Sequence, residues 1–148
     1  MSPTQPRTVD PRQIFRTLRT VWAAMLFSIG IYVVVLTLIH DSSIIPPNRT
    51  FQFGITLMGI VTGAVVLYLR FVRIPGLYSR LEPMDAKTLA LQANFNYILC
   101  YVLSEATALF GFGLAFMHGN PKLYVPLFLA GALLMLLCFP RLPASESQ

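Results

Sequence analysis

Hydrophobic residues along this chain are gathered into four long blocks, which short polar segments separate. The blocks cover residues 21–39, 51–69, 93–117 and 123–140. A helix needs about 20 mostly apolar residues to cross the ~30 Å hydrocarbon core of a bilayer, and each block has about that length. The pattern therefore predicts an all-α integral membrane protein that folds as a four-helix bundle.

Proline, glycine and polar residues mark where these helices begin and end. Asp10 and Pro11 have the N-cap and first-turn chemistry of a helix start. Pro46 and Pro47 prevent the first helix from continuing into the second. The run Gly119–Pro121 predicts a tight turn, so the third and fourth helices should form an antiparallel hairpin.

The polar ends of the chain lie outside this pattern. Residues 10–140 form one predicted domain, preceded by a disordered tail over residues 1–9 and followed by a polar tail over residues 141–148. The third helix is predicted to begin near Ala86, ahead of its apolar block. Its first turns should therefore project from the membrane.

The composition narrows the class of protein further. Of the 148 residues 55% are hydrophobic and only 11% are charged, whereas an average soluble domain has about 25% charged residues. The sequence also lacks a P-loop, a zinc-protease HExxH motif, a Gly-rich dinucleotide motif and a Ser/His/Asp set. We therefore expect no enzymatic activity and no cofactor.

The net charge of +5 is distributed unevenly along the chain, and this predicts an orientation. In a four-span topology only Arg49 and Lys122 fall on one side of the membrane. The other nine basic residues share the opposite side: Arg7, Arg12, Arg16, Arg19, Arg70, Arg73, Arg80, Lys87 and Arg141. Because cytoplasmic segments carry the excess of Lys and Arg, both termini should lie in the cytoplasm, at a bacterial inner membrane. We expect these residues to meet lipid headgroups rather than nucleic acid.

Glu105 is the only charged residue within the four hydrophobic blocks. A carboxylate at that depth is costly, so it should face the bundle interior, water or a partner. On a helical wheel it shares a face with Asn94, Tyr97, Tyr101 and Ser104. This polar seam fits three roles: hydrogen bonding between helices, a path for protons or ions, and contact with a ligand, a lipid or a partner subunit.

The stretch from Leu103 to Phe116, LSEATALFGFGLAF, resembles the carboxylate helix of rotary ATPase c-type proteolipids. In that family small residues surround an ion-binding Glu, and the resemblance implies that Glu105 would be the ion carrier. The match covers about 14 residues, and the Gly-rich partner helix of the family has no counterpart here, since the first block contains only Gly30. More generally, the chain resembles small four-span bacterial membrane proteins.

Three further sets of residues are candidates for packing or ligand binding. Gly59 and Gly63 form a small-x-x-x-small pair that allows another helix to approach closely. His40 and His118 end the first and third helices on the outer side, where a haem or a metal could bind between them. Histidines at helix ends more often interact with the helix dipole, so we expect no metal there.

These patterns favour an interaction protein over a catalyst. The first hypothesis is an accessory, scaffold or oligomerising subunit of a membrane assembly, with a second copy or other membrane proteins as partners in the bilayer. Small residues at Gly59, Gly63, Ala130 and Gly131 support it. The alternative is a protein that translocates protons or ions through Glu105.

Overall fold

The computed structural model describes residues 11–38, 48–79, 86–118 and 121–140, and all regular structure in these ranges is helical. The tails predicted for residues 1–9 and 141–148 lie outside the described residues, as do Asp10 and His40. The elements are α1 (Pro11–Leu38), α2 (Arg49–Tyr68), the π-helical turn η1 (Leu69–Arg73), α3 (Ile74–Tyr78), α4 (Ala86–His118) and α5 (Pro121–Leu137).

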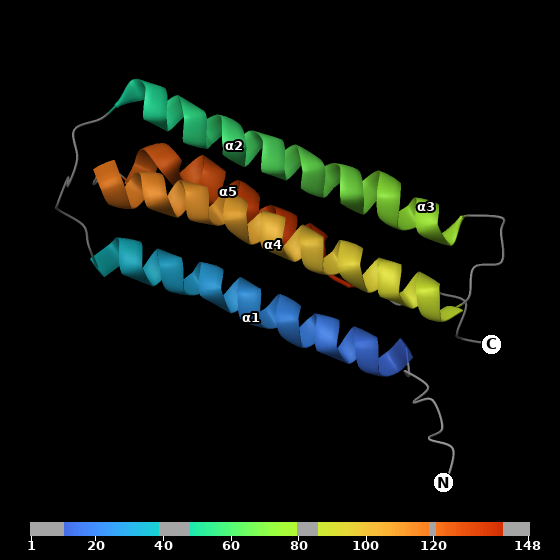
Figure 1. The fold of residues 1–148 in the computed structure, drawn as a ribbon. Coiled ribbons are helices and arrows are strands. Elements are labelled where there is room, and N and C mark those ends of the chain that lie inside the picture. Colours follow the sequence, from blue (N-terminus) through green and yellow to red (C-terminus); the bar gives the residue numbers. More distant parts are fainter. Residues whose placement is uncertain (1–10, 39–47, 80–85, 119–120, 141–148) are drawn as a thin grey trace, which may run out of the picture.

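The predicted all-α architecture is confirmed, and three of its helices are long and apolar enough to cross a membrane. These stretches are Phe15–Leu38, Arg49–Leu77 and Thr88–Met117. The second of them continues through η1 and α3 without a break in the helical path (Figure 1). The fourth apolar stretch, Val125–Leu137, is shorter than the other three.

Helices α4 and α5 pack on each other and form the centre of the four-helix bundle (Figure 1). Helix α1 packs on one side of this pair and α2 packs on the other. Within the described residues α1 and α2 make no contact with each other. The bundle is therefore open on the face of α4 that lies between the two flanking helices.

Glycines bring the central helices unusually close together. A Cβ atom added to Gly131 of α5 would lie 2.5 Å from the backbone nitrogen of Ala108 in α4. A Cβ on Gly111 of α4 would lie 2.8 Å from the backbone nitrogen of Phe128 in α5. These positions have no room for a side chain, so glycine is what allows the two backbones to meet.

The predicted packing pair Gly59 and Gly63 also faces a helix of the same chain. A Cβ on Gly59 would lie 2.7 Å from a methyl group of Leu127, and one on Gly63 would lie 3.4 Å from Leu134. Both leucines belong to α5. The pair therefore seats α2 on α5 within the chain.

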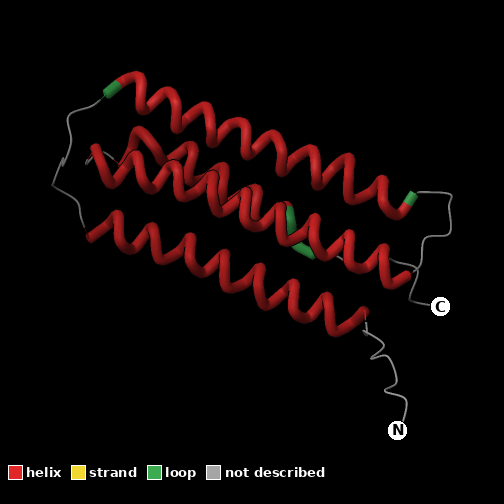
Figure 2. The backbone as a smooth tube through the Cα atoms, in the orientation of Figure 1, coloured by secondary structure: helices red, strands yellow, loops and turns green. Residues whose placement is uncertain are grey.

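Helix α5 ends part-way along α4, as the turn that follows it shows in Figure 2. The last four carbonyl groups of a helix have no partner within it. Here Trp22 of α1 donates its indole N–H to Met135 O at 2.8 Å, and Arg70 of η1 donates its Nε–H to Leu137 O at 2.9 Å. Backbone N–H groups of the turn bond the other two carbonyl groups. Cys138 N–H donates to Leu134 O, and Phe139 N–H donates to Leu136 O.

Candidate functional site

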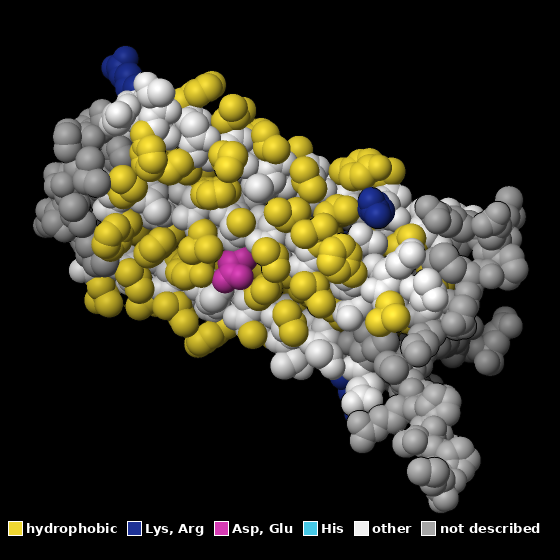
Figure 3. All heavy atoms as spheres, in the orientation of Figure 1, with side chains coloured by type: hydrophobic (Ala, Val, Ile, Leu, Met, Phe, Trp, Pro, Cys, Tyr) yellow, Lys and Arg dark blue, Asp and Glu magenta, His cyan; other side chains and the backbone are white. Residues whose placement is uncertain are grey.

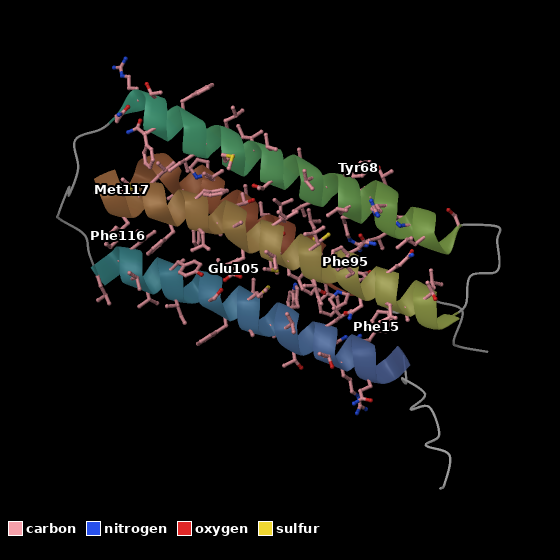
Figure 4. The ribbon with its side chains drawn as sticks, viewed as in Figure 1. Phe15, Tyr68, Phe95, Glu105, Phe116 and Met117 are labelled. Atoms are coloured by element: carbon pink, nitrogen blue, oxygen red, sulfur yellow. The ribbon has the colours of Figure 1, made fainter. Side chains whose placement is uncertain are left out.

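Glu105 lies at the contact between α4 and α1, where two hydroxyl groups reach its carboxylate. The Ser28 hydroxyl is 2.6 Å from Glu105 Oε1, and the Tyr32 hydroxyl donates to the same oxygen at 3.1 Å. Ser28 and Tyr32 are four residues apart on α1, so they lie on one face of that helix. Figure 4 shows Glu105 directed from α4 toward α1.

The same geometry accommodates two protonation states of the carboxyl group. The Ser28 hydroxyl has one hydrogen but two acceptors, because Met25 O also lies 2.7 Å from Ser28 Oγ. An ionised Glu105 accepts hydrogen bonds from both hydroxyls. A protonated Glu105 can instead donate to Ser28 Oγ, which leaves the serine hydrogen for the Met25 carbonyl. Both arrangements use the hydrogen-bond distances that the structure shows at Ser28 and Tyr32.

Aromatic rings cover the cluster on one side. The ring of Tyr32 packs on Phe112 with centroids 5.1 Å apart, and Phe112 stacks on Phe116 at 6.0 Å. Both phenylalanines belong to α4, at i+7 and i+11 from Glu105. These contacts hold the Tyr32 ring in place, so its hydroxyl is directed at the carboxylate.

The predicted polar seam of α4 does not converge on Glu105. Ser104 is buried and donates to Cys100 O within its own helix at 2.7 Å. Tyr101 is fully buried, and its hydroxyl has no hydrogen-bond partner among the described residues. Tyr97 packs on the Tyr101 ring at 6.3 Å, whereas Asn94 is half-buried near the start of the helix.

The partners that sequence reasoning missed are Ser28 and Tyr32. Both stand out as polar side chains within the first hydrophobic block, four positions apart. Residues four positions apart lie on one face of a helix, so this spacing indicates a polar face on α1. What the sequence could not provide was the pairing of α1 with α4, because the two helices are separated by α2.

Two further polar contacts join helices inside the bundle. The hydroxyls of Thr62 in α2 and Thr107 in α4 lie 3.0 Å apart. The thiols of Cys100 in α4 and Cys138 after α5 are free, buried and hydrogen-bonded to each other. Each flanking helix and the central hairpin are thus linked by polar side chains as well as by apolar packing.

A row of α4 side chains around Glu105 borders the open face between α1 and α2, and its members are exposed or half-buried. Ile98 is 38% exposed, Val102 45% and Leu109 41%. Successive members of the row are four, three, four, three and four residues apart, which is the spacing of a coiled-coil seam. The row, called the α4 seam below, consists of Ile98, Val102, Glu105, Leu109, Phe112 and Phe116.

Glu105 is only half-buried within this seam. It is the one acidic residue in the described part of the chain, so the single acidic patch in Figure 3 is its side chain. Hydrophobic side chains surround that patch on the open face (Figure 3). Lipid chains cannot hydrogen-bond the exposed part of the carboxyl group.

The side chains of the predicted histidine pair, His40 and His118, lie outside the described residues. His40 falls outside the described residues, and His118 ends α4 with a side chain that is also outside them. Within the described ranges no three His, Cys, Asp or Glu side chains are grouped as metal ligands.

Comparison with protein families, with curated proteins and with solved structures gives no match for this chain.

Proposed function

We propose that this chain is an accessory or oligomerising subunit of a membrane assembly, with no catalytic role of its own. The observation that supports this most directly is the α4 seam, an open stripe of hydrophobic residues with heptad spacing and one half-buried carboxyl group at Glu105. A second copy that packs on the seam would cover Glu105 and bury the stripe. The heptad spacing of the α4 seam fits a second copy as the partner, because two such seams can pack against each other.

In this proposal the chain crosses a bacterial inner membrane four times, with both termini in the cytoplasm. Helix α5 has 17 residues, which corresponds to ~26 Å and is close to the thickness of the hydrocarbon core. Trp22 and Arg70 meet the C-terminal end of α5, as expected for side chains at the headgroup level. The distribution of basic residues supports the orientation.

The way that the helices pack explains why the seam is free for a partner. The flanking helices α1 and α2 occupy opposite sides of α4, and their described residues do not touch each other across its outer face. Helix α5 covers the inner face through Gly111 and Gly131. The outer face therefore remains open, and helix association in a membrane depends on close packing and polar contacts of the type this face offers.

The mass of the protein in lipid nanodiscs or mild detergent tests this function. We expect a dimer or larger assembly, and a shift to monomer when Val102→Trp places a bulky ring in the seam. Ile60→Trp is the matched control, because Ile60 is also β-branched and exposed, at 60%, but belongs to α2. A monomeric wild-type chain, or equal behaviour of both variants, would contradict the proposal.

The alternative function is proton or ion translocation through Glu105. It is favoured by the cluster of exchangeable hydrogens at Ser28, Tyr32 and Glu105, which accommodates either protonation state. The local resemblance to c-type proteolipids around Glu105 supports the same role. In liposomes that contain the purified protein, Glu105→Gln should then abolish the flux, while Ser104→Ala should retain it. Equal flux in the wild type and Glu105→Gln would eliminate this alternative.

A further inference from the structure

A groove of about 730 Å³ lies between the α2–η1–α3 segment and the first half of α4. This volume is within the range of small-molecule sites. The groove lies beyond the end of α5, since Arg70 bonds the last residue of α5 whereas the lining residues continue from Val72 to Leu77. Only two helical segments therefore form its walls.

The groove combines a cation, neutral hydrogen-bonding groups and apolar surface. Among the described residues, Arg73 is the one charged residue that lines the groove, and no described carboxylate pairs with it. Thr88, Gln92 and Asn96 provide a hydroxyl and two amides from α4. The remaining lining consists of apolar and aromatic surface together with Gly76: Tyr68, Val72, Gly76, Leu77, Leu91 and Phe95.

The cationic and polar groups of the groove, together with its apolar wall, match the two parts of an amphipathic anion. A guanidinium group attracts a phosphate and can donate two hydrogen bonds to it. Tyr68, Val72, Leu91 and Phe95 are more than half exposed, so they extend the groove onto the apolar outer surface. Figure 4 shows Tyr68 on α2 and Phe95 on α4, the two helices that wall the groove.

We propose that this groove binds the headgroup and the upper acyl chain of an anionic phospholipid. Arg73 holds the phosphate, the hydroxyl of Thr88 and the amide of Gln92 bond the glycerol or ester oxygens, and the aromatic wall contacts the acyl chain. Asn96 is buried and donates to Gln92 O within α4 at 2.9 Å, so it supports the wall. Basic sites between helices at the cytoplasmic end of membrane proteins bind such headgroups. The proposal rests on the membrane insertion proposed above. It does not rest on self-association, because no lining residue belongs to the α4 seam.

Native mass spectrometry of the full chain tests this proposal, with phosphatidylglycerol and phosphatidylcholine of identical acyl chains as probes. We expect the wild type to retain phosphatidylglycerol in preference to phosphatidylcholine. Arg73→Gln should lower that retention about fivefold, as expected for one basic residue at an anionic surface. Arg49→Gln is the matched control, because it removes an equal charge from the opposite end of the α2–α3 segment.

A second variant fills the groove without a change of charge. A Cβ on Gly76 meets nothing within 4 Å, so Gly76→Leu is tolerated by the fold and places its side chain in the groove. It should lower lipid retention while the oligomeric mass stays unchanged. Helix content by circular dichroism confirms that each variant is folded, and Gly76→Leu decides the question if Arg73→Gln does not fold.

Three results would overturn the assignment. Equal retention of both lipids would mean that charge is not recognised. An equal loss in Arg49→Gln and Arg73→Gln would mean that net charge, and not the groove, controls retention. Displacement of phosphatidylglycerol by inorganic phosphate would identify the site as one for free phosphate.

Discussion

The indole N–H of Trp22 donates to the carbonyl oxygen of Met135 at 2.8 Å and so links α1 to α5, across 113 residues of sequence. The Trp22 ring also packs edge-on against Phe139, with centroids 5.1 Å apart. The guanidinium of Arg19 lies 5.7 Å from the same Phe139 ring. One end of α5 is thereby fixed to α1 by a hydrogen bond, an aromatic contact and a cation–π contact.

Trp22→Phe should lower the free energy of unfolding by about 1–2 kcal/mol. The substitution retains an aromatic ring beside Phe139 but leaves the carbonyl of Met135 without its donor. Equilibrium unfolding of the detergent-solubilised protein in SDS measures the effect. Tyr68→Phe is the control, since the Tyr68 side chain is 56% exposed. An equal loss in both variants would contradict the role of the indole.

Gly131→Ala should destabilise the protein by about 1–3 kcal/mol, because its new methyl group would overlap the backbone of Ala108. Gly113→Ala is the matched control within the same helix hairpin. A Cβ at Gly113 meets nothing within 4 Å, so stability should be unchanged or slightly higher. Thermal unfolding in detergent compares the two variants, and a stable Gly131→Ala protein would mean that the hairpin is looser than described.

Tyr32→Phe and Tyr101→Phe remove the same hydroxyl from two tyrosines and should have opposite effects. Tyr32 donates to Glu105, so its loss should cost about 0.5–1.5 kcal/mol. The Tyr101 hydroxyl is buried without a partner, so its removal should be neutral or stabilising. SDS unfolding of both variants measures the difference, and a larger loss for Tyr101→Phe would reverse this assignment.

Thr62→Val and Thr107→Val should show a coupling energy of only about 0.6 kcal/mol in a double-mutant cycle. The coupling is small because each hydroxyl also bonds a carbonyl of its own helix, Thr62 to Met58 O and Thr107 to Leu103 O. The cycle is measured by unfolding of the wild type, the two single variants and the double variant. A coupling energy near zero would show that the contact between Thr62 and Thr107 does not help to hold α2 against α4.

Much of the fold could be predicted from the positions of apolar and helix-breaking residues. The start of the long helix at Ala86 is confirmed. The block lengths predicted four spanning helices, and three of these are long and apolar enough to cross a membrane. Block length did not reveal how far α5 extends beside α4. That depends on Trp22 and Arg70, which provide donors for its last carbonyls from distant parts of the chain.

The sequence predicted Glu105 as a site residue but did not predict its hydrogen-bond partners. Glu105 was identified because a charge in an apolar block is costly, whatever surrounds it. Its partners follow from which helix packs against α4, and a helical wheel drawn for α4 alone carries no information about a neighbouring helix. The wheel therefore grouped Glu105 with Ser104 and Tyr101, whereas the structure joins it to Ser28 and Tyr32.

The absence of contact between α1 and α2 in the described residues has a consequence for the order of synthesis. Helix α1 is translated first, yet the groups that bond it, Glu105 and Met135, are translated last. In the proposed four-span topology, α1 waits in the bilayer until the α4–α5 hairpin has been inserted. Until then Tyr32 lacks Glu105 as its acceptor, and the Ser28 hydroxyl bonds only Met25 O of its own helix. Helix association in membranes follows insertion as a separate stage. During that interval α1 is free to pair with the hairpin of a neighbouring chain, which gives nascent copies a route to exchange their first helices.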